Sequence, residues 1–300
     1  MFTAVRCVHG GLGDDMNHST LNVPTCEVDP LLVSGVARGE PAACEALAAA
    51  LHDHEGRCLS SGPGYLVLSG LGQLDEEAAR RFVLAVSAML GWPMPQDFDG
   101  EMIREVRDRG VTLESGATVR YSDTRQGGNL HTDGMHRPGE IPAYFTLHCV
   151  RQAASGGALV LVHVDDLVRE LCLEPDVVAA LREPVHFDTR DGRPDRPATV
   201  PRSILEFDGG SPRITYLREY VESAHRRPGI APLSRLQVRA MDRLDALLAR
   251  EDLRTYRRLE PGQLIVINNR TIVHGRTAFE NEPGEGRNRL LFRTWIAAAR

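Results

Sequence analysis

The sequence contains no lysine: all 35 basic side chains are arginines, set against 41 acidic residues and a net charge of −6. The absence of an amine side chain excludes Schiff-base chemistry and the lysine of a phosphate-binding P-loop. Anions must therefore be bound by guanidinium groups or backbone amides. The negative net charge argues against nucleic acid as a partner, because phosphates call for a basic surface.

Long apolar runs, an export signal and cysteine motifs are missing too. No run approaches the roughly 18 apolar residues of a membrane span. Residues 1–17 carry Gly10, Gly11 and Gly13 where a secretory signal needs an apolar run. The six cysteines form no C-x-x-C pair and no disulfide framework, so we expect reduced thiols. These features predict a cytoplasmic protein that works on neither membranes nor nucleic acid.

The apolar pattern predicts mainly β structure with flanking helices. Residues 1–40 lack periodicity and are expected to form an irregular leader, with residues 41–300 forming one domain. Helices are expected over residues 42–52, from Asp75 onward, and over 233–248. Short apolar runs between turn residues predict strands at 65–68, 143–150, 158–164, 203–207, 213–217, 263–267 and 290–296. We interpret them as a jelly roll (a double-stranded β-helix), with residues 190–201 as a mobile excursion.

A candidate metal motif lies in residues 129–134, Asn-Leu-His-Thr-Asp-Gly. On a strand, residues i and i+2 project to the same face, so His131 and Asp133 can bind one ion from one side. At this composition chance alone gives one or two His-x-acid triplets, and the chain has three, the others beginning at His163 and His186. Spacing therefore does not rank the three triplets, and their context must.

That context is residues 268–279, which contain His274, followed by Arg289 and Arg293. An early His-x-Asp, a distal His and a later Arg, in this order, resemble the taurine dioxygenase/clavaminate synthase-like family of Fe(II)/2-oxoglutarate oxygenases. The resemblance spans roughly residues 60–297. It implies a jelly-roll core in which His131, Asp133 and His274 bind iron and leave positions for 2-oxoglutarate and O₂.

The same resemblance implies roles for the two late arginines. Arg289 is the first choice to bind the distal carboxylate of 2-oxoglutarate, a task suited to a planar bidentate donor. Arg293, four residues later on the same strand, is a second contact to the cosubstrate or to the substrate. Residues 156–159, Gly-Gly-Ala-Leu, lack the threonine with which many relatives help to hold 2-oxoglutarate.

Substrate contacts are less defined in the sequence. His136 and Arg137 directly follow the metal motif and are candidates, because loops beside a metal often touch substrate. Leu217-Arg218-Glu219 stands where some relatives that hydroxylate arginine carry aspartates, which weakens the case for a guanidinium substrate. Arg276, beside His274, is expected to pair with an acidic residue.

The resemblance implies a dioxygenase that uses Fe(II), 2-oxoglutarate and O₂ to oxidise, by default to hydroxylate, a C–H bond of a small molecule. An amino acid or a specialised metabolite is the expected substrate. Two alternatives stay open: a jelly-roll metal-binding protein without 2-oxoglutarate turnover, and a zinc- or manganese-dependent hydrolase or isomerase on the same fold. Arg289 distinguishes the dioxygenase from the metal-binding protein, because a protein that only binds metal needs no arginine to bind a dicarboxylate.

Overall fold

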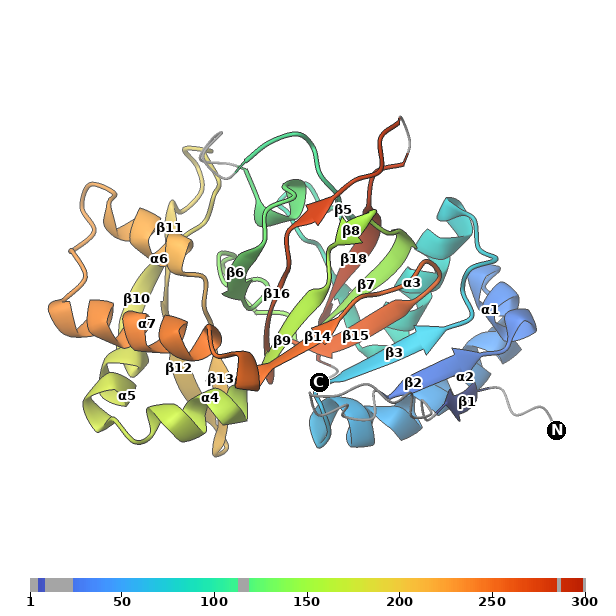
Figure 1. Ribbon diagram of the computed structural model, residues 1–300, viewed down its shortest axis with the longest axis horizontal. Helices are drawn as coiled ribbons and strands as arrows, with labels where there is room; N and C mark the ends of the chain where they lie inside the picture. Colours follow the sequence, from blue (N-terminus) through green and yellow to red (C-terminus); the bar gives the residue numbers. More distant parts are fainter. Residues whose placement is uncertain (1–4, 9–23, 113–118, 285–286, 299–300) are drawn as a thin grey trace.

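Two β-sheets form the centre of the molecule (Figure 1). The computed structural model describes residues 5–8, 24–112, 119–284 and 287–298. The strands of the larger sheet are β1 (Val5–Val8), β2 (Thr25–Val28), β3 (Tyr65–Ser69), β4 (Trp92–Met94), β5 (Arg104–Val106), β7 (Tyr144–Arg151), β15 (Leu264–Asn268) and β18 (Leu290–Ala297). They pair in the order β1-β2-β3-β15-β7-β18-β4, with β5 also on β18. The β2–β3 pair is parallel, and the β3–β15, β15–β7 and β7–β18 pairs are antiparallel.

The smaller sheet is antiparallel and carries the chemistry described below. Its order is β14 (Arg254–Arg257), β9 (Leu159–His163), β16 (Ile272–Arg276) and β6 (Gly128–His131). Three two-stranded ribbons flank the sheets: β10 (Pro184–Asp188) with β11 (Thr199–Ser203), β12 (Leu205–Asp208) with β13 (Ser211–Ile214), and β8 (Ser155–Gly156) with β17 (Phe279–Glu280).

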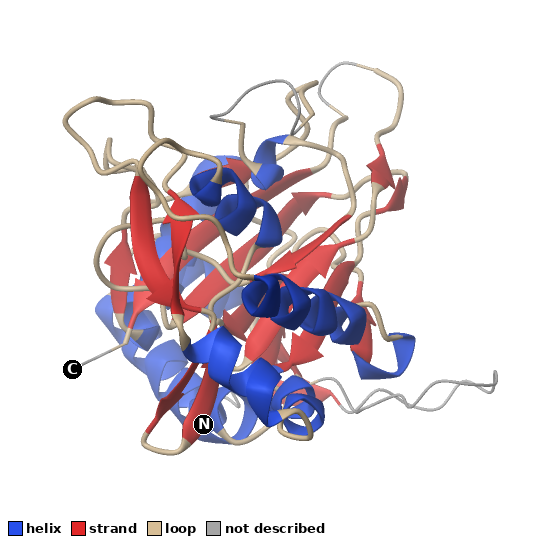
Figure 2. Ribbon diagram, turned by 90° about the vertical axis from the view of Figure 1, so that its left-hand side faces the viewer, coloured by secondary structure: helices blue, strands red, loops and turns tan. Residues whose placement is uncertain are grey.

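The helices fall into two groups. They are α1 (Pro30–Ala37), α2 (Pro41–His54), α3 (Glu76–Leu90), α4 (Val164–Leu171), α5 (Pro175–Arg182), α6 (Arg218–His225) and α7 (Arg235–Leu248), with a π-helical turn at Glu55–Ser60 and 3₁₀ turns at Tyr121–Asp123 and Glu251–Leu253. Helices α1–α3 lie to the right of the sheets in Figure 1, and α4–α7 form a lobe with β10–β13 to the left. Figure 2 looks onto that lobe and has its helices in front of the strands. No helix in the described part of the chain is both long and apolar enough to cross a bilayer.

Strand β15 (Leu264–Asn268) shows that the larger sheet is covered on both faces. Leu264 and Val266 belong to the core shared with α1–α3, whereas Ile265 and Ile267 belong to the core between the two sheets. Successive residues of a strand point to opposite faces, and all four side chains are fully buried. A strand buried on both faces therefore reads as a continuous apolar run.

The prediction of mainly β structure with flanking helices is confirmed, and the differences are local. Regular structure begins before residue 40, because β2 and α1 occupy residues 25–37 of the expected irregular leader. Residues 1–4 and 9–23 of that leader lie outside the described residues. The expected excursion over 190–201 was wrong at its end, where β11 pairs with β10. Helices α5 and α6 were not expected.

Candidate metal centre

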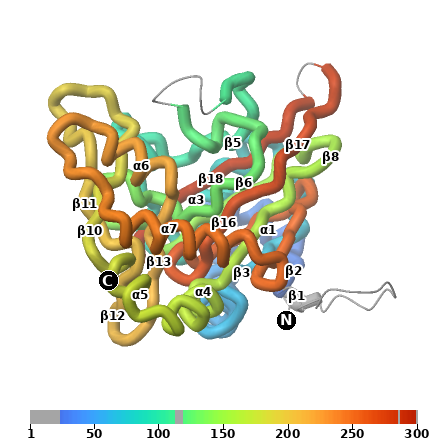
Figure 3. The backbone as a smooth tube through the Cα atoms, turned by 60° about the vertical axis from the view of Figure 1, so that its left-hand side comes forward, coloured from blue at the N-terminus to red at the C-terminus, as the bar shows by residue number. Residues whose placement is uncertain are grey.

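His131 and His274 are direct partners across one pair of strands. His131 ends β6, His274 lies in the middle of β16, and the register places them opposite each other. Partners in an antiparallel pair hold their side chains close together. The two imidazole rings accordingly lie 4.4 Å apart, centre to centre. Figure 3 traces β16 beside β6, although a long stretch of chain separates them.

Asp133 is positioned by a turn rather than by the strand that the sequence suggested. Strand β6 ends at His131, so Asp133 lies two residues beyond it. Asn269, between β15 and β16, accepts the backbone N–H of Asp133 at 2.7 Å and donates to its carbonyl oxygen at 3.0 Å. Gly134 then turns the chain with φ of +80°, where a Cβ would stand 2.4 Å from a ring carbon of Pro142. The turn between β15 and β16 therefore fixes the backbone position of Asp133, from which its carboxylate extends.

Both oxygens of the Asp133 carboxylate accept hydrogen bonds from β18. Arg293 Nη1 donates to Oδ1 at 3.0 Å, and Trp295 Nε1 donates to Oδ2 at 2.9 Å. Arg293 is itself held by the side chain of Gln96, which accepts from Nε at 2.8 Å. Burial would raise the pKa of Asp133, but the Arg293 guanidinium and the neighbouring imidazoles of His131 and His274 outweigh it and lower that pKa. The carboxylate is therefore an oriented anion.

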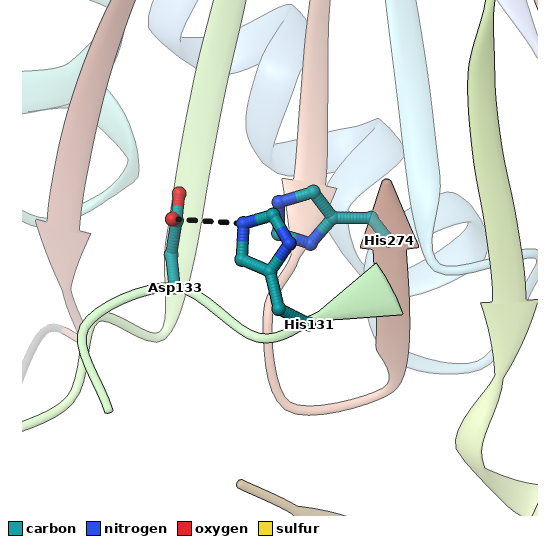
Figure 4. A group of neighbouring side chains, drawn as sticks. All are labelled: His131, Asp133 and His274. Atoms are coloured by element: carbon teal, nitrogen blue, oxygen red, sulfur yellow. Dashed lines mark ion pairs between the residues drawn. The ribbon is translucent and has the colours of Figure 1, made fainter. Parts of the chain in front are cut away.

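His131, Asp133 and His274 converge on one point (Figure 4). Each offers a nitrogen or oxygen ligand atom, and these atoms all lie within 4.8 Å of one another. All three side chains are buried. His131 Nδ1 lies 2.8 Å from the carbonyl oxygen of Asn129, which can only accept, so Nδ1 carries the proton and Nε2 keeps its lone pair. Burial, followed by the neighbouring His131, lowers the pKa of His274 well below its ordinary value, so this ring is a neutral ligand as well.

The cluster opens into a cavity between the two sheets. Apolar side chains from both sheets form much of its wall, among them Phe145, Leu159 and Leu291. Four arginines also line it: Arg120, Arg276, Arg289 and Arg293. A mainly apolar wall with a few convergent polar groups is typical of sites for small molecules.

Arg289 is buried at one end of this cavity without a counter-charge. It is 2% exposed, and its Nε donates to Gln152 Oε1 at 3.0 Å while Nη2 donates to the carbonyl of Gly157 at 3.3 Å. Nη1 has no hydrogen-bond partner among the described residues. Burial, and then repulsion from Arg276, lower the pKa of Arg289 to about 9. A buried guanidinium in this state has the chemistry to bind an anion.

Arg276 does not pair with an acidic residue, contrary to the expectation from the sequence. Within the described ranges it makes no ion pair; Nη2 donates to the carbonyls of Tyr121 at 3.1 Å and Thr124 at 2.5 Å. Its guanidinium lies 4.1 Å from the Tyr121 ring centre, and its Nε has no partner in the described part of the chain. Two buried guanidiniums, Arg276 and Arg289, thus face one cavity uncompensated.

The remaining candidates are placed differently. His136 lines the cavity, whereas Arg137 stacks on Phe98 at 4.7 Å and is not part of the cavity wall. The two competing triplets have local roles: His163 accepts a backbone N–H as the N-cap of α4, and His186 bonds a threonine on β11. The sequence predicts a helix ending at Leu171 with Asp165 or Asp166 as its cap. The helix is present, but its cap is His163. Within the described residues neither histidine belongs to a cluster that could hold a metal.

Three residues that support the cluster were not found from the sequence: Asn269, Trp295 and Gln96. Trp295 lies two residues after Arg293, so alternation along the strand places both on one face. That signal was available. Asn269 lies within the segment that contains His274, but only the folded turn brings it to Asp133. Gln96, 197 residues before Arg293, carries no sequence signal of its contact.

Comparisons with known proteins agree with this geometry. Residues 38–295 match the model of the family described as taurine catabolism dioxygenase TauD, TfdA family. The chain is 25% identical over 245 residues to FR-33289 synthase of Streptomyces rubellomurinus (strain ATCC 31215), covering 79% of this chain and 70% of that protein. Among solved structures, asparagine oxygenase with Fe(II), 2S,3S-3-hydroxyasparagine and succinate aligns with a TM-score of 0.69 and 21% identity, covering 91% of this chain and 93% of that one. The non-heme iron oxygenase OrfP with Fe and alpha-ketoglutaric acid aligns with a TM-score of 0.65 and 18% identity, covering 92% and 94%.

Proposed function

Because the chain belongs to the taurine catabolism dioxygenase TauD, TfdA family, we propose that it is a non-haem Fe(II)- and 2-oxoglutarate-dependent dioxygenase that hydroxylates a C–H bond of a small molecule. One observation carries the proposal: a three-ligand cluster and a buried, uncompensated arginine line the same cavity. A metal-binding module without a cosubstrate has no use for the second feature.

His131, Asp133 and His274 are the residues that would hold the iron. Two neutral imidazoles and one carboxylate are the donor set of Fe(II) oxygenases that leave positions open for other ligands. Bound there, Fe(II) supplies the activation of O₂ and accepts 2-oxoglutarate as a chelating ligand. Because the aspartate is present as the third ligand, hydroxylation is favoured over halogenation, which needs that position for a halide.

Arg289 is the residue that would bind the distal carboxylate of 2-oxoglutarate. A carboxylate at Nη1 would give the guanidinium its missing acceptor and its missing counter-charge, which offsets the cost of burying it. Arg276 adds positive charge at the same end of the cavity. The fold neighbours named as oxygenases hold Fe(II) with succinate and Fe with alpha-ketoglutaric acid, which supports this pair of cofactors.

The residues around the cluster orient the aspartate and exclude water. Arg293 and Trp295 fix both carboxylate oxygens of Asp133 and keep it ionised. Phe145 packs against His274 with ring centres 4.3 Å apart, so the histidine cannot turn freely. Apolar walls limit access of water to the reacting atoms, which protects a reactive oxidant from side reactions.

A small organic molecule is the proposed substrate. The neighbours' names include hydroxyasparagine and (3S)-hydroxy-L-Arg, both products of hydroxylation on a small molecule. We further propose one oxygenase domain over residues 41–300 and a cytoplasmic location. The location is supported by Cys44, Cys149 and Cys172, which form no disulfide.

Anaerobic spectroscopy tests the proposed chemistry directly. Fe(II) and 2-oxoglutarate added to the protein without O₂ are expected to give the visible charge-transfer band of the chelate, and substrate with O₂ is expected to give succinate. Metal binding without that band in folded protein supports the metal-binding alternative instead. An activity that proceeds without O₂ and 2-oxoglutarate supports the hydrolase or isomerase alternative.

The indole of Trp295 offers a sharper test of the cluster. Trp295→Phe keeps an aromatic ring but removes the hydrogen bond to Asp133 Oδ2, and we expect the affinity for Fe(II) or Zn(II) to fall about 10-fold, because partners of metal ligands typically contribute 10- to 100-fold. Metal titration of the purified protein measures this. Trp92→Phe is the matched control, since Trp92 is the other tryptophan of the chain and is 68% exposed. Equal affinities in the two variants would remove the positioning role of Trp295.

A further inference from the structure

The walls of the cavity carry far more positive than negative charge. Its lining includes four arginines but, among the described residues, a single acid, Asp133. Both oxygens of that acid already accept hydrogen bonds from Arg293 and Trp295. One metal dication and one 2-oxoglutarate dianion cancel each other, so loading the site leaves this excess unchanged. Asp97, Asp108 and Asp123 lie outside the lining and offset part of this charge at Arg120 and Arg276, and a further anionic group in the cavity would offset more of it.

Arg120 is the arginine that the proposed function leaves without a task. Its guanidinium forms no ion pair with any described acid, and Nη1 reaches only the carbonyl of Gln96, at 3.4 Å. The nearby Asp123 is occupied by Arg104 and Arg109, at 2.8 and 3.0 Å. Burial, and then the charge of Arg104, lower the pKa of Arg120. The side chain is thus a half-buried cation facing the cavity.

His136 faces the same region and lacks partners as well. The imidazole is buried, yet neither ring nitrogen has a hydrogen-bond partner in the described residues. It lies edge-on between the rings of Tyr220, at 5.6 Å, and Trp295, at 6.1 Å. Burial, and then the guanidinium of Arg120, lower its pKa to about 3, so the ring is neutral with one N–H to donate. Buried polar groups are normally satisfied, so an imidazole in a cavity wall with both nitrogens unpartnered points to a ligand.

We infer that the substrate carries an anionic oxygen-rich group, such as a carboxylate, which binds to Arg120 with His136 as a second donor. This inference rests on the proposed function, because it assigns the Arg289 end of the cavity to 2-oxoglutarate. The two ends have separate surroundings: Arg289 lies by Gln152 and Gly157, whereas Arg120 acts on His136 and Tyr220.

The excess of positive charge in the cavity also disfavours binding of a substrate that carries a free amine. An ammonium group in this cavity would meet guanidiniums and find no unoccupied carboxylate among the lining residues that the structure describes. Glu219, on α6, accepts from Asn129 at 3.1 Å and is not part of the lining. We therefore expect acids whose nitrogen is absent or uncharged to bind better than zwitterions.

Three probes with one carbon skeleton test the inference: butanoate, butanamide and 4-aminobutanoate. Their dissociation constants are measured by ligand-observed NMR on protein saturated with Zn(II) and 2-oxoglutarate. We expect butanoate to bind at least about 10-fold more tightly than the other two, since a hydrogen bond to a charged group contributes about this much. Wild-type protein that does not prefer the acid would overturn the inference.

Variants assign the preference to Arg120. Arg120→Gln is expected to remove it, Arg120→Lys to retain most of it, and His136→Phe to weaken butanoate binding about threefold to tenfold with ring packing kept. Arg239→Gln, on the exposed surface of α7, is the control that leaves it unchanged. An Arg120→Gln protein that is folded and still prefers butanoate would contradict the assignment. If Arg120→Gln does not fold, loss of the preference in His136→Phe decides in its place.

The design separates this inference from the proposed function. Titration with 2-oxoglutarate alone tests the latter, and its failure to bind contradicts the cosubstrate assignment. The three probes are also measured in an Arg289→Gln background without 2-oxoglutarate and without metal, with and without the additional change Arg120→Gln. A preference for butanoate that the additional change removes belongs to the Arg120 end, and one that it leaves in place belongs to Arg276 and contradicts the inference. That series supports or overturns the anion site whatever the outcome with 2-oxoglutarate.

Discussion

His274→Ala is expected to abolish turnover and to lower the affinity for Fe(II) or Zn(II) by about 100-fold or more. The ring supplies one of three ligand atoms that lie within 4.8 Å of one another, and it is buried directly opposite His131. No other histidine or acid among the described residues joins that cluster to replace it. Removing a ligand itself must cost at least as much as removing a partner of a ligand, which typically costs 10- to 100-fold.

Metal titration and succinate release measure this effect in parallel. His163→Ala is the matched control, because His163 begins a competing His-x-Asp triplet but caps α4 instead. Its loss is expected to reduce stability by about 1 kcal/mol, as for other helix caps, and to leave metal binding unchanged. An active His274→Ala protein would mean that the wrong histidine had been chosen.

The sequence could predict the cluster because two segments carried it together. One His-x-Asp triplet was uninformative among three, and the distal His274 with the later arginines selected the triplet whose side chains the structure brings together with His274. The sequence could not predict how Asp133 is held. Its backbone is fixed by Asn269 and its carboxylate by Trp295, and both contacts depend on strands that become neighbours only in the folded sheets.

The same holds for the secondary structure: elements with local sequence signals could be predicted, and elements stabilised by distant partners could not. The expected helix over 233–248 agrees with α7 because its apolar stripe and its Ser234–Gln237 capping box are local signals. Helices α5 and α6 escaped prediction because eight residues are too few to be stable alone. The cap of α4 was predicted wrongly because it is a histidine rather than a typical capping residue. The β10–β11 ribbon escaped because prolines and charges masked a strand that is stabilised by its partner.

Arg289→Ala is expected to weaken 2-oxoglutarate binding by about 100-fold or more and iron binding by less than about threefold. Two hydrogen bonds between a guanidinium and a carboxylate contribute roughly 1.5–3 kcal/mol each, so their loss costs at least a factor of this size. Iron is affected little, because the described contacts of Arg289 include none of the three ligands. The stability of the ligand-free protein is expected to change little, because the alanine removes a buried charge that has no counter-charge.

The separation of these effects is what identifies the role of Arg289. Calorimetric titration of 2-oxoglutarate into the Zn(II)-loaded protein gives the first affinity, metal titration gives the second, and thermal unfolding gives the stability. Arg287→Ala serves as the control, since this neighbouring arginine is exposed and pairs only with Glu282 among the described residues, at 3.8 Å. Equal losses of metal and 2-oxoglutarate in Arg289→Ala would count against the assignment, because they would mean that the arginine supports the cavity as a whole. A loss of affinity for 2-oxoglutarate alone would identify the buried guanidinium of Arg289 as the group that binds the 2-oxoglutarate carboxylate.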